Sequence, residues 1–583
     1  MKFPDNTVNI TVADWRAQVE KDLAGVPFDK ALVYRSPENM AIQPLYTDGP
    51  KTAPPGAPPY TRGSSAEPKR FGICMPHEAL EAEARLSEDL EGGADALWLR
   101  VDTDELPDLL GRMDLRAIRL LLDAGGAAAM PSLIAAAAKQ SVPLGELRFA
   151  LCADPLGMTA GGQGPLRPLA TSLKELGHAA HLVSQLAPLA SSVLVSTLPY
   201  HAAGADSVDE LAVALATGAT YLDALLEAGF SAADAARQIA VQISVGRDTF
   251  GELCKLRALR LCWHKLFAAA GAPTSPLPLL HAVSSLRTLT ERDPWVNMLR
   301  VTTQVFAAAL GGADLVTPAA YDELLGTSPL GRRVARNTGL ILRDESHLGR
   351  VLDAAGGSYY LETLTDELAR KAWSRFQTLQ SRGGLIETLL DGTLRKEIAA
   401  SAEKRRELVA KRKEAVVGVS EFANLANLGE PRRKPPVRFV EDPIPPALPI
   451  HRDAEPFEAL RDRAEPLGSD GTVSLSLLGP PAEYRARVGF AVGFFAAAGL
   501  VAKTDAAHAQ VTCICGSDER YAAEAAARAR ELKAAGLQRV LVAGRPGALE
   551  ATLREAGVDD FIFVGCDAVT VLSSVLSSIR TLS

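Results

Sequence analysis

Short apolar runs alternate with alanine- and leucine-rich helical stretches between about residues 70 and 385. Runs that are apolar at nearly every position are typical of strands buried on both faces, as in parallel sheets. Seven or eight such units over about 315 residues predict a (β/α)8 TIM barrel, with a doubly wound sheet as the main alternative. The predicted strands are Ala96–Val101, Ile118–Leu122, Leu147–Cys152, Ser192–Ser196, Ala240–Val245, Leu277–Ala282 and Ala313–Val316, with an eighth near Leu340–Leu342 or Val351–Leu352.

A second, smaller α/β unit is predicted for residues 466–583. Ser517 is a suitable N-cap for a helix over Asp518–Ala535, because its hydroxyl can accept a bond from a free amide of the first turn. Strands separated by such helices predict a small open parallel sheet of flavodoxin type. Its predicted strands are Val473–Leu478, Val511–Cys515, Val540–Ala543 and Phe561–Val564.

Two further segments lie outside these units. Residues 1–69 are predicted to form an N-terminal arm, with a short amphipathic helix over Val12–Leu23 and a proline-rich, extended stretch after it. Because the arm carries apolar side chains such as Leu45 and Tyr46, we expect it to pack on its own chain or on a partner. Residues 386–465 are predicted to be a helical and proline-rich connector.

Composition narrows the class of protein. With 47% hydrophobic and 23% charged residues in 583, the chain can bury a large core. The net charge of −8 argues against binding to nucleic acid, which requires a basic surface. The most apolar charge-free run, Gly489–Ala502, is far shorter than the roughly 20 residues of a membrane-spanning helix. Widely spaced cysteines and the lack of a signal-type apolar segment predict a cytoplasmic protein that does not enter a membrane.

Candidate catalytic groups are sparse. The nine histidines show no metal-binding spacing, so no metal site is predicted. His201 follows a predicted strand at the barrel end where catalytic residues gather, and His281 closes another strand. Each histidine alone is more often a hydrogen-bonded wall residue than an acid or a base. The residues by themselves predict a scaffold without a recognisable catalytic constellation.

Several colinear motifs resemble the methylmalonyl-CoA mutase family. Arg333–Ser346 (RVARNTGLILRDES) is similar to the family's R-I-A-R-N-T-x-L-x-L-x-x-E-S almost letter for letter. The resemblance covers nearly the whole chain and implies a barrel that threads coenzyme A through its centre. It also implies a flavodoxin-like, cobalamin-binding-type domain, whose histidine binds cobalt in the catalytic chains. The other matching segments are Pro44–Tyr46, Lys255–Ala258 (KLRA), Thr290–Arg300 (TERDPWVNMLR), Asp353–Tyr360 (DAAGGSYY) and Ala454–Glu458 (AEPFE).

The chain departs from the family's cobalt-binding turn, Asp-x-His-x-x-Gly. That turn should fall at Gly479–Ala486, which reads GPPAEYRA. Glu483 or a neighbour stands where the histidine belongs, and Pro481 stands where the aspartate belongs. Because the imidazole ligand is normally held by that carboxylate, the resemblance implies a degenerate cobalamin-binding domain.

The barrel motifs also depart from the family pattern, again by the loss of functional residues. With the following Ala-Gly aligned, Pro199 occupies the place of the family's catalytic histidine, and His201 lies two residues later. His281 is kept in a motif that has lost its glutamine, and Asn337 is kept within the Arg333–Ser346 motif. We therefore expect no catalytic residue here, with His201, His281 and Asn337 as residual pocket residues.

These departures imply a small, non-catalytic (β) subunit of a heterodimeric, adenosylcobalamin-dependent mutase that interconverts methylmalonyl-CoA and succinyl-CoA. By the same resemblance, the large catalytic subunit would be the partner and would bind adenosylcobalamin, leaving this chain without a cofactor. The alternative is a diverged acyl-CoA mutase, or another barrel enzyme, that is active on its own.

Overall fold

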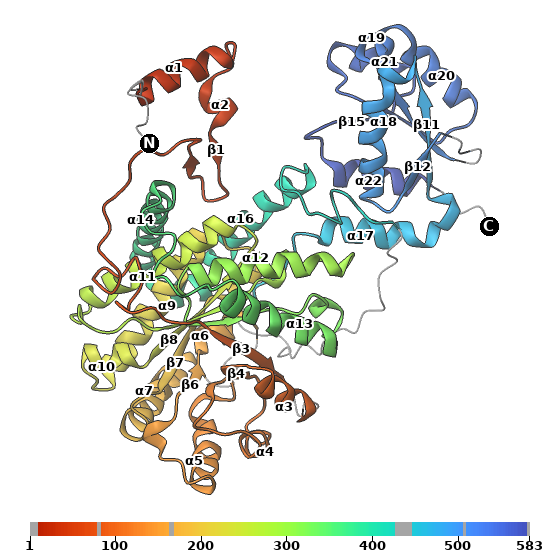
Figure 1. Cartoon of the computed structure of the whole chain (residues 1–583). Coiled ribbons are helices and arrows are strands. Elements are labelled where there is room, and N and C mark those ends of the chain that lie inside the picture. The colour runs from red at the N-terminus through yellow and green to blue at the C-terminus, as the bar shows by residue number, and fades with distance from the viewer. Residues whose placement is uncertain are drawn as a thin grey trace, which may run out of the picture.

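A computed structural model describes residues 10–78, 83–162, 168–425, 446–504, 506 and 509–579 (Figure 1). Eight parallel strands close into a barrel in the order β10-β3-β4-β5-β6-β7-β8-β9. The closed barrel confirms the predicted fold and excludes the doubly wound alternative for this unit. The strands are β3 Gly72–His77, β4 Ala96–Leu99, β5 Arg119–Leu122, β6 Phe149–Ala153, β7 Ser191–Ser196, β8 Ile239–Val245, β9 Leu279–Ser284 and β10 Leu315–Thr317.

Seven of the predicted barrel strands are confirmed, but both predicted positions of the eighth strand are wrong. Leu340–Leu342 continues the helix α13, and Val351–Leu352 lies in a turn. The eighth strand is instead the first, β3, whose Gly72–His77 segment contains Pro76. Proline lowers the strand signal because it cannot donate to a ladder hydrogen bond.

Helices surround the barrel, and the outward side chains of the strands pack against them in one large core. None of the helices in the described residues is long and apolar enough to cross a membrane. The helices of this region are α3 Glu83–Glu91, α4 Leu106–Leu110, α5 Met130–Lys139, α6 Pro155–Ala160, α7 Leu169–Leu186, α8 Leu198–Ala202, α9 Ser207–Glu227, α10 Ala232–Arg237, α11 Thr249–Ala269, α12 Asn297–Leu310, α13 Pro329–Leu340 and α14 Tyr359–Ser381.

A buried ion cluster joins α13 to the first βα unit. Arg332 Nε and Arg336 Nη1 each donate to one oxygen of Asp89 at 2.7 Å. His77 Nε2 lies 3.2 Å from the same carboxylate, and the Asp89 side chain is completely buried. Since Arg332 and Arg336 are four residues apart, both project from one face of α13. The motif around Asn337 therefore has a packing function.

The N-terminal arm has two parts. Helices α1 Val12–Asp22 and α2 Phe28–Leu32 pack on each other through Trp15 and Phe28, with ring centroids 6.1 Å apart. No residue of α1 is buried, and both helices stand clear of the barrel (Figure 1). The following stretch, which includes the short hairpin strands β1 Tyr34–Arg35 and β2 Ala41–Ile42, packs on the barrel, as expected for part of the arm. There, Arg260 donates to the carbonyl oxygens of Tyr60 and Thr61.

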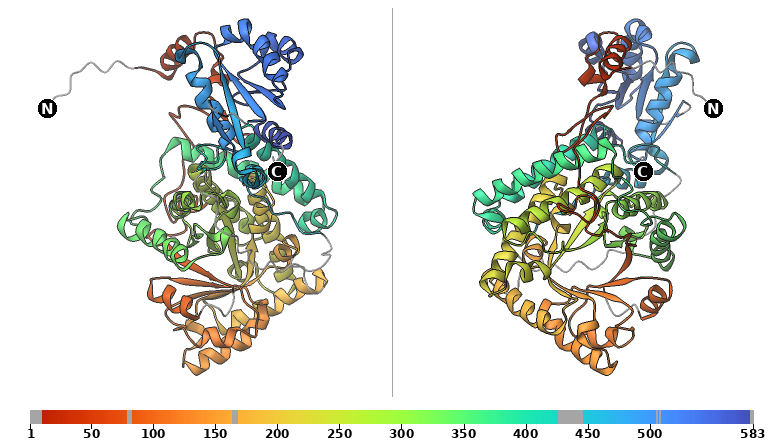
Figure 2. Two further views of the ribbon diagram at one scale, coloured as in Figure 1. Left: turned by 90° about the vertical axis from the view of Figure 1, so that its right-hand side faces the viewer. Right: turned by 60° about the vertical axis from the view of Figure 1, so that its left-hand side comes forward.

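The C-terminal domain is a five-stranded parallel sheet in the order β12-β11-β13-β14-β15, which is the flavodoxin order. All four predicted strands are present, the short edge strand β12 was missed, and Ser517 caps its helix as predicted. The domain stands at one end of the molecule (Figure 2). The connecting helices are α15 Gly384–Leu390, α16 Thr393–Ala410 and α17 Glu455–Ala464. The domain contains β11 Thr472–Leu477, β12 Val501–Lys503, β13 Val511–Cys515, β14 Arg539–Ala543, β15 Asp560–Ile562, α18 Pro481–Ala496, α19 Asp518–Arg520, α20 Ala526–Ala534, α21 Glu550–Glu555 and α22 Ala568–Ser578.

Candidate functional site

Buried, mostly apolar side chains meet across the centre of the barrel. Successive residues of a strand point to opposite faces, so every second residue faces the lumen. Trp98 on β4 meets His281 on β9 edge to face, with ring centroids 5.6 Å apart. These strands are not neighbours, so the contact crosses the lumen. The lumen cluster consists of Cys74, Ala96, Trp98, Leu121, Ala150, Cys152, Leu194, Ala240 and Leu315, all buried.

His281 lies within a continuous chain of hydrogen bonds along the lumen wall. Its Nδ1 is 3.1 Å from Gln242 Nε2, and its Nε2 is 2.7 Å from Thr317 Oγ1. Ser196 Oγ donates to Gln242 Oε1, and Thr317 Oγ1 donates to the Cys74 carbonyl. These directions place the single proton of a neutral ring on Nε2. Burial lowers the pKa of His281 to about 3, in agreement with the neutral form.

His201 lies at the carboxyl end of the strands, between Glu210 on α9 and Ser285 after β9. Its Nδ1 is 3.2 Å from Glu210 Oε2, and its Nε2 is 2.7 Å from Ser285 Oγ. The carboxylate can only accept, so Nδ1 carries the proton and Ser285 donates to Nε2. Burial, and then the nearby Arg287 charge, lowers the pKa of His201 to about 3.

The same carboxylate also binds a buried lysine. Lys255 Nζ lies 2.8 Å from Glu210 Oε2 and 2.6 Å from Glu252 Oε2, and it donates to the Ser244 carbonyl at 2.8 Å. Burial favours the protonated acid, but the charge of Lys255 and the hydrogen bond from His201 hold the pKa of Glu210 well below its usual range. The KLRA motif indicated Lys255 but not its partners, since Glu210 is 45 residues away in the chain.

A serine, a histidine and a carboxylate in this order resemble a hydrolase triad. In this chain Ser285 is only 1% exposed and the carboxylate is shared with the Lys255 ammonium. A nucleophile must reach its substrate, whereas this hydroxyl is enclosed. The geometry therefore fits a packed polar layer that ties α8, α9 and α11 to the strand ends.

The other residues suggested by the sequence lie apart from this layer or lack a polar group. Pro199 lies in the first turn of the short helix α8, where proline is tolerated because its missing amide would have no partner within the helix. Asn337 lies on α13, outside the barrel wall, and does not join the two histidines. The structure thus brings His201 and His281 to the barrel interior and leaves Asn337 on the outer layer.

The connector lies across the carboxyl end of the barrel. The amides of Leu448, His451 and Asp453 donate to the carbonyls of Ala160, Ala202 and Arg287, at 2.8–2.9 Å. Those carbonyls belong to the segments that follow β6, β7 and β9. Residues 446–454 therefore cover this side of the barrel mouth, where the active sites of barrel enzymes are found.

A partly exposed ion pair lies where a ligand would bind in the C-terminal domain. In a sheet of this order, ligands bind at the carboxyl ends of the strands beside the point where strand order reverses, between β11 and β13. There, Arg520 Nε donates to Glu483 Oε2 at 2.8 Å. Gly479 has a φ of +78°, and a Cβ at this position would lie 2.6 Å from the Glu483 carboxylate.

These residues do not fit the cobalt-binding turn that the resemblance leads one to expect. Pro481 begins α18, so Glu483 lies in the first turn of a helix. Its negative charge is favourable at a helix N-terminus. No cluster of three metal-ligating side chains occurs among the residues that the structure describes.

The fold defines an α/β barrel protein with a flavodoxin-like C-terminal domain. A family model described as methylmalonyl-CoA mutase matches residues 100–437. The chain is 36% identical to a protein of Streptomyces virginiae named methylmalonyl-CoA mutase small subunit, over 99% of this chain and 97% of that one. It is 32% identical to the protein of that name from Propionibacterium freudenreichii subsp. shermanii, over 97% and 94%. It is 28% identical to the methylmalonyl-CoA mutase of Cereibacter sphaeroides, over 70% and 64%. The chain belongs to the methylmalonyl-CoA mutase family.

The substitution Glu483→His is expected to leave the chain unable to bind adenosylcobalamin or to isomerise methylmalonyl-CoA. The new imidazole would replace one partner of Arg520 at a helix start fixed by Pro481, with no carboxylate positioned to orient it. The visible spectrum of the desalted protein, after mixing with the cofactor in the dark, measures binding. Turnover by this single variant, with the wild-type chain as control, would contradict the expectation.

Proposed function

We propose that this chain is the small, non-catalytic subunit of a heterodimeric, adenosylcobalamin-dependent methylmalonyl-CoA mutase. The observation that carries the proposal is the filled lumen. The resemblance implies that coenzyme A passes through the barrel centre of the catalytic chains, whereas here Trp98 and His281 meet across it. The connector over the barrel mouth and the Glu483–Arg520 pair support the same conclusion.

The partner in this proposal is the large catalytic subunit, which holds the cofactor and the substrate. The names of the relatives as small subunits support a larger partner. The α1–α2 hairpin supports it as well, because Ile10, Val12 and Val26 beside these helices are 71%, 50% and 49% exposed. Such apolar surface on an element that stands clear of its own barrel is suited to cover by a second chain.

We also place the heterodimer in the cytoplasm. All seven cysteines are unpaired and buried in the structure. Desolvation raises the pKa of the Cys74 thiol to about 12, so this thiol stays protonated and unreactive. Unpaired cysteines are typical of proteins from a reducing compartment.

Reconstitution tests the proposal. The chain alone, mixed with adenosylcobalamin and desalted, is expected to elute without the cofactor and to show no mutase activity. Together with the larger family member of the same organism it is expected to form a 1:1 complex that binds cobalamin and is active. Activity and stoichiometric cofactor in the isolated chain would instead support the alternative, an acyl-CoA mutase active on its own.

A further inference from the structure

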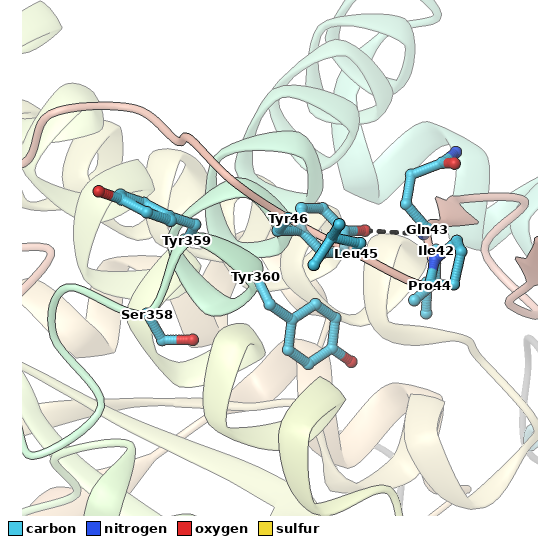
Figure 3. A pocket seen from close by; sticks show the side chains of 8 residues that line it. All are labelled: Ile42, Gln43, Pro44, Leu45, Tyr46, Ser358, Tyr359 and Tyr360. Carbon is cyan, nitrogen blue, oxygen red and sulfur yellow. Dashed lines mark hydrogen bonds between the residues drawn. The ribbon is translucent and has the colours of Figure 1, made fainter. Parts of the chain in front are cut away.

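A pocket of about 380 Å³ lies between the arm and the first turn of α14, on the outside of the barrel (Figure 3). Two segments more than 300 residues apart in the sequence form its walls. The residues that line it are Ile42, Gln43, Pro44, Leu45, Tyr46, Ser358, Tyr359 and Tyr360. We call this site the aromatic pocket.

Three aromatic rings form a connected group at the aromatic pocket. Tyr46 and Tyr360 have ring centroids 5.3 Å apart, and Phe250 packs edge-on against Tyr360 at 5.9 Å. Phe250 and Tyr359 remain 52% and 50% exposed, and Leu45 remains 42% exposed. Aromatic residues are enriched in protein interfaces, and tyrosine is enriched among the residues that contribute most to binding.

The aromatic pocket is preformed, because the arm is fixed on both sides of it. Before the pocket, Lys371 Nζ donates to the carbonyls of Glu38 and Asn39 at 3.3 and 3.2 Å. After it, Gly49 lies so close to α14 that a Cβ would be 3.2 Å from the Tyr359 carbonyl. Within it, the Tyr46 hydroxyl accepts a bond from the Gln43 amide at 3.0 Å. A preformed pocket orders few groups on binding, which favours affinity.

A carboxylate lies close to these rings. Asp248 caps α11 two residues before Phe250, is exposed, and has no ion pair within the described residues. Phe250, two residues after Asp248, packs on Tyr360. Burial, and then the Asp248 carboxylate, raises the pKa of Tyr360 to about 12. Glu38, on the arm, also has no ion pair in the part of the chain that the structure describes. Two arginines lie nearby, and both are already paired: Arg247 with Glu414 and Arg405 with Asp453.

We propose that the aromatic pocket takes a basic side chain, lysine or arginine, of the larger partner subunit. Aromatic faces attract such cations, and the unpaired carboxylate of Asp248 adds to the attraction. The pocket wall belongs to the same arm whose exposed α1–α2 hairpin is the surface assigned to the partner above. The inference rests on the proposed heterodimer, and it adds the chemistry of one contact.

A pair of matched variants tests the proposal with the larger subunit, purified separately, as the probe. Tyr360→Leu removes the aromatic face and is expected to weaken the complex about tenfold in a titration at low salt, whereas Tyr360→Phe keeps the face and is expected to bind as the wild type does. Asp248→Asn keeps the helix cap and removes the charge. It is expected to weaken the complex about threefold and to reduce its salt dependence.

The outcomes separate this proposal from the one on which it rests. If the wild-type chain forms no complex, the proposed heterodimer fails and the contact fails with it. If the wild type binds and both Tyr360→Leu and Asp248→Asn bind as tightly as the wild type, only the proposal of a cation-binding pocket is overturned. Equal weakening by Tyr360→Leu and Tyr360→Phe would show a hydroxyl contact and would also overturn it. Thermal unfolding of each variant shows whether Tyr360→Leu remains folded. If Tyr360→Leu is unfolded, the affinity of Asp248→Asn for the larger subunit tests the proposal instead.

Discussion

Substituting Lys255 by methionine is expected to lower the free energy of unfolding of the barrel by about 3–5 kcal/mol. Lys255 is 1% exposed and forms ion pairs with both Glu210 and Glu252. Methionine fills similar space but leaves two carboxylates uncompensated in the interior, and a buried unpaired charge is one of the largest penalties a substitution can cause. Urea unfolding followed by tryptophan fluorescence measures the effect. All five tryptophans precede residue 374, so the flavodoxin-like domain does not contribute to the signal.

The matched control is Lys411→Met. Lys411 pairs with Glu407 at 3.1 Å on the surface of the connector, with side chains 39% and 59% exposed. Exposed pairs of this kind contribute about 0–1 kcal/mol, so this variant should unfold close to the wild type. Removing the two carboxylate charges as well, in the triple variant Lys255→Met, Glu210→Gln, Glu252→Gln, should recover part of the loss. If Lys255→Met and Lys411→Met behave alike, the buried cluster does not stabilise the barrel.

The stability of the barrel is expected to fall as the pH decreases from about 6.5 towards 3. His201 and His281 each have a folded-state pKa of about 3, and the unfolded value is about 6.5. Between these values the unfolded chain binds more protons, so stability is complete above the unfolded pKa and is lost on acidification. At pH 5 the loss is about 2 kcal/mol for each histidine.

Substitution of His281 by glutamine isolates this effect. Between pH 7.5 and pH 5, the free energy of unfolding of the variant is expected to fall by about 2 kcal/mol less than that of the wild type, whatever its stability at neutral pH. His178, which is exposed on α7, provides the control, and its replacement by glutamine should leave the pH slope unchanged. An identical slope for wild type and His281→Gln would show that the lumen histidine is not neutral and buried in solution.

For the candidate site, the sequence mainly predicted which of the family's functional residues are missing. The segment GPPAEYRA lacks the residues of the Asp-x-His-x-x-Gly turn, and this is visible in the sequence. The structure adds that Glu483 lies at the start of a helix and is paired with Arg520. The two histidines were interpreted as wall residues, and their hydrogen bonds agree with that interpretation. The partners of His201 were missed, because Glu210 and Ser285 lie in different βα units.

The alternation of apolar runs and helices, together with the colinear motifs, was enough to determine a barrel, a flavodoxin-like domain and the family. These features are local, since a strand or a helix face is encoded by neighbouring residues. The first strand was hidden because Pro76 interrupts its pattern. Tertiary structure alone decided that Trp98 meets His281 across the lumen and that the arm and α14 enclose an aromatic pocket. It also decided that Asp89 binds Arg332 and Arg336, which lie more than 240 positions later in the sequence. Such contacts depend on strand register and barrel closure, which bring together residues that no local pattern connects.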